Sequence, residues 1–139
     1  MSRYVLDTDT LSLYQHGHPA VCQHVKSHPK QDVLTTVVTV QEQLFGWYNL
    51  LLRTKQRDQL AVAYQSLVDS VYFLAAMPIL PFPEAAILRF EHLRSLKLNI
   101  GKMDLRIAAI TLETGSTLVT RNRRDFQRVP GLLIEDWSV

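Results

Sequence analysis

The chain has 139 residues, of which 47% are hydrophobic and 20% are charged, and its formal net charge is +2. This composition is ordinary for a globular protein, and the length suits a single domain over residues 1–139. The small net charge excludes a polycation that wraps nucleic acid, so any basic contact with RNA has to be local. The single cysteine, Cys22, excludes an internal disulfide and a multi-cysteine zinc site.

The sequence indicates neither an export signal nor a membrane span. Asp7 and Asp9 interrupt the N-terminal segment where a signal peptide needs a continuous apolar run. The longest apolar stretch, 71–82, contains Pro78 and Pro81 and is too short to cross a bilayer. We therefore expect a cytoplasmic protein that does not insert into membranes.

Short apolar or β-branched runs alternate with helical patterns along the whole chain. Strands are predicted at residues 3–6, 32–36, 79–80, 117–120 and 132–134, and helices at 19–26, 37–53, 57–75, 83–98 and 103–114, after a first helix that starts at 8–10 and ends before 17. The helices at 37–53 and 57–75 are predicted to pair as a hairpin. The alternation favours an α/β fold with a mostly parallel sheet covered by helices on both faces.

Acidic side chains lie at the ends of several of these elements. Asp7 comes directly after the first strand, where a side chain reaches the carboxyl edge of a parallel sheet. Glu42 has the apolar helical neighbours Val38 and Phe45, although a first-turn acid that complements the helix dipole explains it about equally well. Asp104 begins an apolar helix on its inward side. A turn or cap role explains Asp7 or Asp104 taken singly.

The stretch 101–126 adds a second pair of polar groups after the strand at 117–120. Asn122 and Asp125 have the spacing of a capping box for a short helix, which is a sufficient explanation for the two alone. Four acids grouped near strand ends, without His or Cys, nevertheless favour Mg²⁺ or Mn²⁺. Such ions commonly bind phosphate oxygens, so the expected substrate is a phosphodiester or a phosphomonoester.

With these motifs the chain resembles the PIN-domain ribonucleases, and its size and layout resemble the VapC-type toxins of bacterial toxin–antitoxin pairs. The resemblance rests on YVLDTD at 4–9, TVQEQL at 39–44, GKMDLRIAA at 101–109 and TRNRRDF at 120–126. It implies a PIN-like three-layer α/β/α sandwich. It also implies a catalytic and metal-binding set of Asp7, Glu42, Asp104 and Asp125, supported by Thr120 and Asn122, with Asp9 as an outer member.

The resemblance further implies Mg²⁺- or Mn²⁺-dependent hydrolysis of RNA to 5′-phosphate and 3′-hydroxyl ends, an antitoxin protein as partner, and a homodimer. Gln43 departs from the family pattern, in which an apolar residue often follows the acid. Basic side chains beside the last motif are candidates for binding RNA phosphates, namely Arg121, Arg123 and Arg124. A solvated loop with ion pairs to Glu135 or Asp136 explains these arginines comparably well.

Two other functions stay open at this point. Asp7, Thr8, Asp9 and Thr10 spell the DxDxT motif of haloacid-dehalogenase-like phosphatases, in which Asp7 would be the nucleophile. A noncatalytic PIN domain that binds RNA or protein is the second alternative.

Two residue groups are assigned structural roles. The histidines at 16, 18, 24 and 28 are predicted to lie on the surface rather than to bind metal. The aromatic residues Phe45, Trp47, Tyr48, Tyr64, Tyr72 and Phe73 are predicted to belong to the core. The family resemblance suggests that some of them instead line a dimer contact or an antitoxin groove.

Overall fold

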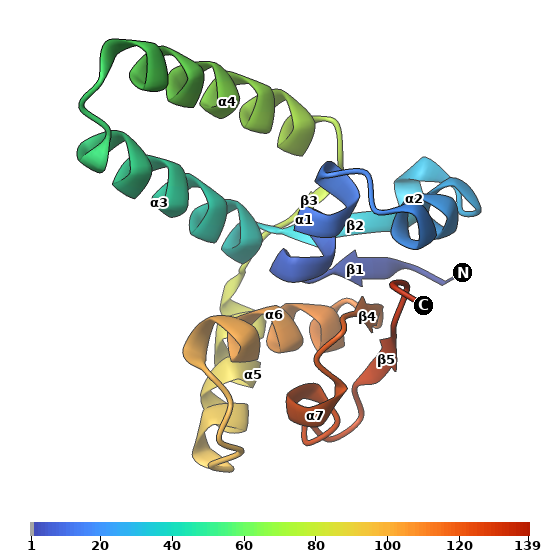
Figure 1. Cartoon of the computed structure of the whole chain (residues 1–139). Helices are drawn as coiled ribbons and strands as arrows, with labels where there is room; N and C mark the ends of the chain where they lie inside the picture. The colour runs from blue at the N-terminus through green and yellow to red at the C-terminus, as the bar shows by residue number, and fades with distance from the viewer. Residues whose placement is uncertain (1) are drawn as a thin grey trace.

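A computed structural model describes residues 2–139 and places one parallel sheet between two layers of helices (Figure 1). The strands are β1 (Tyr4–Leu6), β2 (Val33–Thr36), β3 (Ile79–Leu80), β4 (Thr117–Val119) and β5 (Leu133–Glu135). They lie in the order β3-β2-β1-β4-β5, and every neighbouring pair is parallel. The predicted mostly parallel sheet is confirmed.

The helices agree closely with the predicted pattern. They are α1 (Thr8–Gln15), α2 (Pro19–Lys26), α3 (Val37–Arg53), α4 (Arg57–Ala75), α5 (Glu84–Ser95), α6 (Lys102–Glu113) and α7 (Arg123–Phe126), with a 3₁₀ turn at Lys30–Asp32. The helix predicted at 83–98 ends earlier, at Ser95. Lys97 and Asn99 adopt the left-handed φ values 53° and 60°, which a continuing α-helix cannot accommodate.

Alternate strand side chains point to opposite faces of the sheet and build two separate cores. The first core contains Val5, Leu34 and Leu118 with side chains of α5, α6 and α7. The second core contains Leu6, Val33 and Val119 with side chains of α1, α2, the end of α4 and the C-terminal segment. The predicted three-layer α/β/α sandwich is therefore confirmed.

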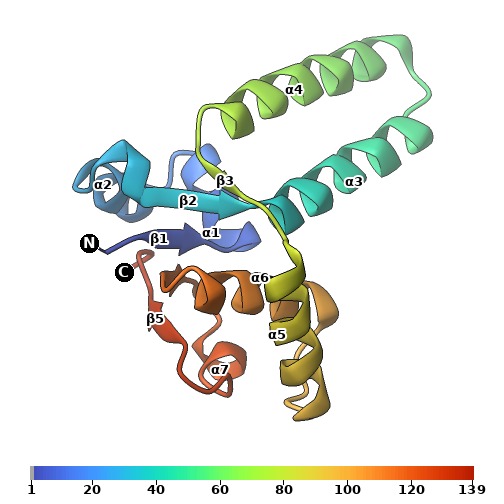
Figure 2. The ribbon, with the colours of Figure 1, turned by 180° about the vertical axis from the view of Figure 1, so that it is seen from behind.

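The hairpin of α3 and α4 extends away from these layers, as Figure 2 shows from behind. Its aromatic side chains are largely exposed, contrary to the predicted core role: Phe45 is 64%, Tyr48 59%, Tyr64 54% and Tyr72 74% exposed. The helical spacing correctly predicted apolar stripes, but a stripe does not specify what covers it. Trp47 and Phe73 are half-buried.

Two of the histidines predicted on the surface have a packing role. His24 and His28 are half-buried and stack on Trp137, with ring centroids 5.3 Å and 5.1 Å away and interplanar angles of 10° and 9°. These contacts attach the C-terminal segment to α2. Within residues 2–139, no helix combines the length and the apolar character needed to cross a membrane.

The sheet order places a topological switch point at its centre. Within the sheet, β2 and β3 lie on one side of β1, whereas β4 and β5 lie on its other side. Leu6 pairs with Val119, so the residues that follow β1 and β4 emerge next to each other. In open α/β sheets, ligands bind in the crevice formed at this position.

Candidate active site

Asp7 follows β1 and caps α1 at the same time. Its Oδ1 accepts a hydrogen bond from the backbone amide of Thr10 at 2.8 Å, which satisfies a free amide of the first turn. Only 6% of Asp7 is exposed. Burial raises the pKa of this carboxyl group above its ordinary value, although hydrogen bonds from Thr120 and Thr10 oppose the shift. A nearby cation would therefore stabilise the ionised form of Asp7.

Glu42 reaches the site from α3 and is oriented by Thr8. The Thr8 hydroxyl donates to Glu42 Oε1 at 2.7 Å and lies 3.1 Å from the Thr39 hydroxyl. Thr39 is fixed at the start of α3, because its backbone amide donates to the Thr36 hydroxyl at 3.1 Å. Sequence reasoning identified Glu42 but missed Thr8 as its partner. The only signal for Thr8 was its position directly after Asp7.

Asp104 lies in the first turn of α6, where the apolar side of the helix packs into the core. The pKa of its carboxyl group is raised to about 6, first by burial and then by the negative charges of Asp7, Glu42 and Asp125, in that order. Asp104 is therefore within electrostatic range of the three other predicted acids, although these come from distant parts of the sequence.

Asp125 is held by the loop that follows β4. The hydroxyl of the fully buried Thr120 accepts a hydrogen bond from the backbone amide of Asn122 at 2.9 Å. Asn122 Nδ2 donates to Asp125 Oδ2 at 2.9 Å, while the Asp125 amide donates to Asn122 Oδ1 at 3.3 Å. Asn122 thus caps α7 and also orients Asp125. A capping role for Asn122 is therefore compatible with a role in the site.

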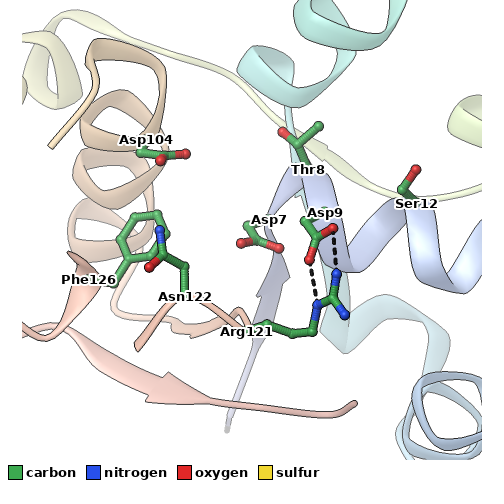
Figure 3. Close-up of a pocket in the computed structure, with 8 residues that line it drawn as sticks. All are labelled: Asp7, Thr8, Asp9, Ser12, Asp104, Arg121, Asn122 and Phe126. Carbon is green, nitrogen blue, oxygen red and sulfur yellow. Dashed lines mark hydrogen bonds and ion pairs between the residues drawn. The ribbon is translucent and has the colours of Figure 1, made fainter. Parts of the chain in front are cut away.

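A cavity of about 590 Å³ opens where these elements meet (Figure 3). It is lined by Asp7, Thr8, Asp9, Ser12, Asp104, Arg121, Asn122 and Phe126. In Figure 3 the carboxylates of Asp7 and Asp104 face the same space from opposite sides. Glu42 and Asp125 do not line the cavity themselves, but they hydrogen-bond to the lining residues Thr8 and Asn122.

Comparison with known proteins agrees with this geometry. The family model for the PIN domain matches residues 4–132. The chain belongs to the PIN domain family. Among characterised relatives of this PIN domain, "Ribonuclease VapC2" of Rickettsia felis is 27% identical over 141 residues, covering 97% of this chain and 98% of the relative. "tRNA(fMet)-specific endonuclease VapC" of Shigella flexneri is 24% identical, covering 99% of this chain and all of the relative.

Solved structures share the fold over the same length. The DNA-bound VapBC complex of Salmonella typhimurium contains a chain with a TM-score of 0.81 and 21% identity, and the match covers 99% of both chains. A chain in the VapBC2 complex of Rickettsia felis, bound to a promoter DNA fragment, gives a TM-score of 0.72 at 24% identity and covers 96% of this PIN domain and 98% of that chain. At this level of identity the likeness establishes the fold.

The chemistry of the donor set suits a hard divalent cation. Carboxylate oxygens are the side-chain ligands that Mg²⁺ and Mn²⁺ prefer, and the lining residues include neither His nor Cys. Within residues 2–139 of this PIN domain, however, no three acidic, His or Cys side chains already stand close enough to hold an ion. The metal-binding roles of Asp7, Glu42, Asp104 and Asp125 stay predictions.

The arginines near the last motif have different surroundings. Arg121 donates two hydrogen bonds to Asp9, from Nε at 2.7 Å and from Nη2 at 3.0 Å, rather than pairing with Glu135 or Asp136. Arg123 and Arg124 are exposed on α7. RNA binding by Arg121, Arg123 and Arg124 stays a prediction.

The raised pKa of Asp104 predicts how the stability of the metal-free PIN domain depends on pH. The carboxyl pKa is about 6 in the folded state and 3.8 in the reference state, so the folded protein binds more protons between these values. The free energy of unfolding should therefore fall as pH rises through this window, by about 1–2 kcal/mol after allowance for solvent screening. Urea titrations in EDTA across the window measure this slope. An Asp104→Asn variant that retains the full slope would contradict the assignment to Asp104.

Proposed function

We propose that this PIN domain is a ribonuclease that uses Mg²⁺ or Mn²⁺ to hydrolyse RNA phosphodiester bonds. The observation that carries the proposal is the placement of four acids from distant parts of the chain around the switch point of the sheet, where the charges of three of them act on Asp104. Asp7 comes from the end of β1, Glu42 from α3, Asp104 from α6 and Asp125 from α7, and Asp104 is within electrostatic range of the other three. Negative charges placed together on one buried and three partly buried carboxylates are unfavourable unless a cation compensates them.

A bound Mg²⁺ or Mn²⁺ would activate water and neutralise charge on the phosphate during hydrolysis. The chain contributes the remaining parts. Asp7 and Asp104 present carboxylate oxygens to the cavity. Thr8 orients Glu42, and Asn122 orients Asp125. Such supporting hydrogen bonds keep ligands in place and reduce the reorganisation that the reaction requires. We assign the four acids the catalytic and metal-binding roles, with Thr120, Asn122 and Asp9 in support.

The relatives support RNA as the substrate and a toxin–antitoxin role. Those that match nearly the full chain are named a ribonuclease and a tRNA(fMet)-specific endonuclease. The structural neighbours include VapBC complexes, one of them bound to DNA from the promoter of its own system. We infer that this protein is the toxin of such a pair, that it acts in the cytoplasm, and that it binds a cognate antitoxin. The homodimer stays a prediction from the family resemblance.

The hairpin of α3 and α4 is the surface that we propose for the antitoxin. Phe45 and Tyr48 are exposed by 64% and 59% on α3, and α4 adds Tyr64 and Tyr72. Large exposed apolar groups on a projecting hairpin are typical of a protein interface, in which aromatic side chains contribute most of the affinity. An amphipathic helix of the antitoxin is the partner type that suits such a surface.

Replacing Phe45 and Tyr48 together with Ser is expected to weaken antitoxin binding by roughly thirtyfold or more, because two buried aromatic anchors that contribute about 1 kcal/mol or more each together contribute about 2 kcal/mol or more. Calorimetry with the cognate antitoxin measures this change. Leu88→Ser on α5 is the matched control, because Leu88 is 61% exposed and lies outside the hairpin. Equal losses in the two proteins, or no loss in either, would exclude the hairpin as the docking surface.

Incubation of purified protein with RNA tests the proposed activity directly. We expect cleavage with Mg²⁺ or Mn²⁺, none with EDTA, and fragments that carry 5′-phosphate and 3′-hydroxyl ends. Intact RNA under all three conditions would favour the noncatalytic alternative. The phosphatase alternative finds no support in the family match, and hydrolysis of a phosphomonoester with an aspartyl-phosphate trapped on Asp7 would be needed to revive it.

A further inference from the structure

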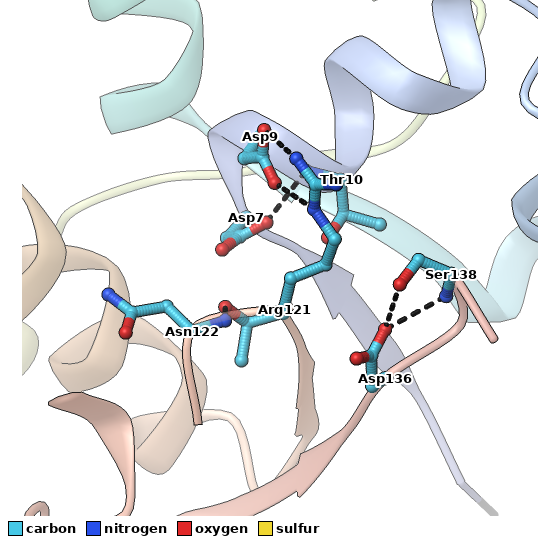
Figure 4. Close-up of polar contacts among 8 residues, drawn as sticks. Asp7, Asp9, Thr10, Arg121, Asn122, Asp136 and Ser138 are labelled. Carbon is cyan, nitrogen blue, oxygen red and sulfur yellow. Dashed lines mark hydrogen bonds and ion pairs between the residues drawn. The ribbon is translucent and has the colours of Figure 1, made fainter. Parts of the chain in front are cut away.

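Asp9 and Arg121 form an ion pair on the Asp7 side of the acidic cavity, at its mouth (Figure 4). Asp9 lies in the first turn of α1 and Arg121 follows β4, so the pair joins two elements that are 112 residues apart in sequence. Both side chains line the cavity that also contains Asp7 and Asp104. The pair thus stands where a nucleic acid would have to enter.

The Arg121 guanidinium is a group that can bind phosphate, and in this structure it binds the carboxylate of Asp9 instead. The Arg121 guanidinium donates from Nε and Nη2 to the two oxygens of Asp9. The same bidentate geometry suits two oxygens of a phosphate group, whereas a lysine would offer only a point charge. The Oδ1 of nearby Asp136 accepts from the backbone amide and the hydroxyl of Ser138 in Figure 4, and Arg121 directs its hydrogen bonds to Asp9.

Two further features make exchange of the partner feasible. The side chains of Arg121 and Asp9 are 49% and 52% exposed, so solvent screens their attraction and reaches both partners. Arg121 is also the one cationic side chain among the described residues that line the cavity. The cavity therefore offers an approaching phosphate a single cationic side chain, which Asp9 already occupies, whereas Arg128 pairs with Asp125 at 3.5 Å outside the lining.

We propose that Asp9 restrains Arg121 at the mouth of the cavity and that an RNA phosphate displaces Asp9 from the guanidinium, so that this pair tunes the affinity for RNA. The inference rests on the proposed ribonuclease function. It makes Asp9 a positioning residue that acts through Arg121. If Asp9 is removed, Arg121 no longer has to exchange partners when RNA binds.

A double-mutant cycle tests this coupling. RNA affinity is measured by fluorescence anisotropy with a labelled RNA oligonucleotide in EDTA at low salt, where turnover stops and phosphate contacts contribute most. Wild type, Asp9→Asn, Arg121→Gln and the double variant are compared, with Asp9→Ser as a second form of the first change. We expect Asp9→Asn to tighten binding about two- to fivefold when Arg121 is present, and clearly less when it is absent. Arg121→Gln should lower the salt slope by about 0.7.

Glu113→Gln is the matched control for the lost charge. Glu113 accepts from Arg89 Nε at 2.9 Å in a similarly exposed pair, but it lies at the opposite end of α6 from Asp104. Equal tightening by Asp9→Asn with and without Arg121, or equal tightening by Glu113→Gln, would show a general charge effect and overturn the proposal. Wild-type protein that neither binds nor cleaves RNA would instead remove the ribonuclease function itself.

Discussion

Replacing Asp104 with Asn is expected to reduce metal-dependent RNA cleavage by more than about a hundredfold and to stabilise the metal-free protein at neutral pH. The activity should fall because a cavity-facing carboxylate is lost, and even supporting residues around metal ligands commonly contribute ten- to a hundredfold. The stability should rise because Asn removes a charge that Asp7, Glu42 and Asp125 repel. Single-turnover cleavage with Mn²⁺ and urea titration in EDTA measure the two effects.

The opposite signs of these effects separate a functional role from a folding defect. A misfolded variant would lose activity and stability together. A second readout is the increase of the melting temperature that a bound cation produces in the wild type, which Asp104→Asn should abolish. Glu113→Gln removes the same charge from the other end of α6 and should leave the cleavage rate and the cation-induced increase of the melting temperature unchanged. Full cleavage activity in the Asp104 variant would refute its place in the site.

Replacing Trp137 with Ala is expected to lower the free energy of unfolding by about 3–5 kcal/mol, the usual range for removing a buried Trp. Trp137 is 1% exposed and contacts His24, His28 and Tyr4, with the Tyr4 ring centroid at 5.2 Å. Its Nε1 also donates to Glu135 at 2.9 Å, at the end of β5. Trp137 therefore packs the C-terminal segment, next to the edge strand β5, against β1 and the α2 region.

Thermal and urea unfolding measure this loss, and we expect the melting temperature to fall by about 10 °C or more. Trp137→Phe keeps an aromatic ring and should have a clearly smaller effect. Val139→Ala, at a position that is 89% exposed, should be neutral. A Trp137→Ala variant as stable as the wild type would show that the C-terminal segment is not part of the cooperative core.

The sequence was sufficient to predict the sheet, the helices and the order of the acidic motifs. Apolar strands and helical stripes carry this information locally, which is why α3, α4 and β3 have the predicted boundaries. The end of α5 was misplaced because Lys97 adopts a left-handed conformation, and a lysine gives no sequence signal of the kind that glycine or asparagine gives.

Contacts between distant parts of the chain were beyond the reach of these patterns. Thr8 orients Glu42 and Asp9 binds Arg121 only because β1 lies between β2 and β4, and no local periodicity encodes those pairings. The exposure of Phe45 was unpredictable for a related reason. An apolar stripe indicates a buried face, but it does not distinguish a core from a surface that a partner covers.

A crystal structure of the protein soaked with Mn²⁺ tests the central claim most directly, because the anomalous signal locates the metal independently of the protein atoms. The four-acid assignment predicts a peak in the cavity with Asp7 and Asp104 oxygens at about 2.0–2.2 Å, typical for a small divalent cation. Glu42 and Asp125 should coordinate the ion directly or through water. A fully loaded crystal whose metal lies elsewhere, with these carboxylates unmoved, would contradict the account.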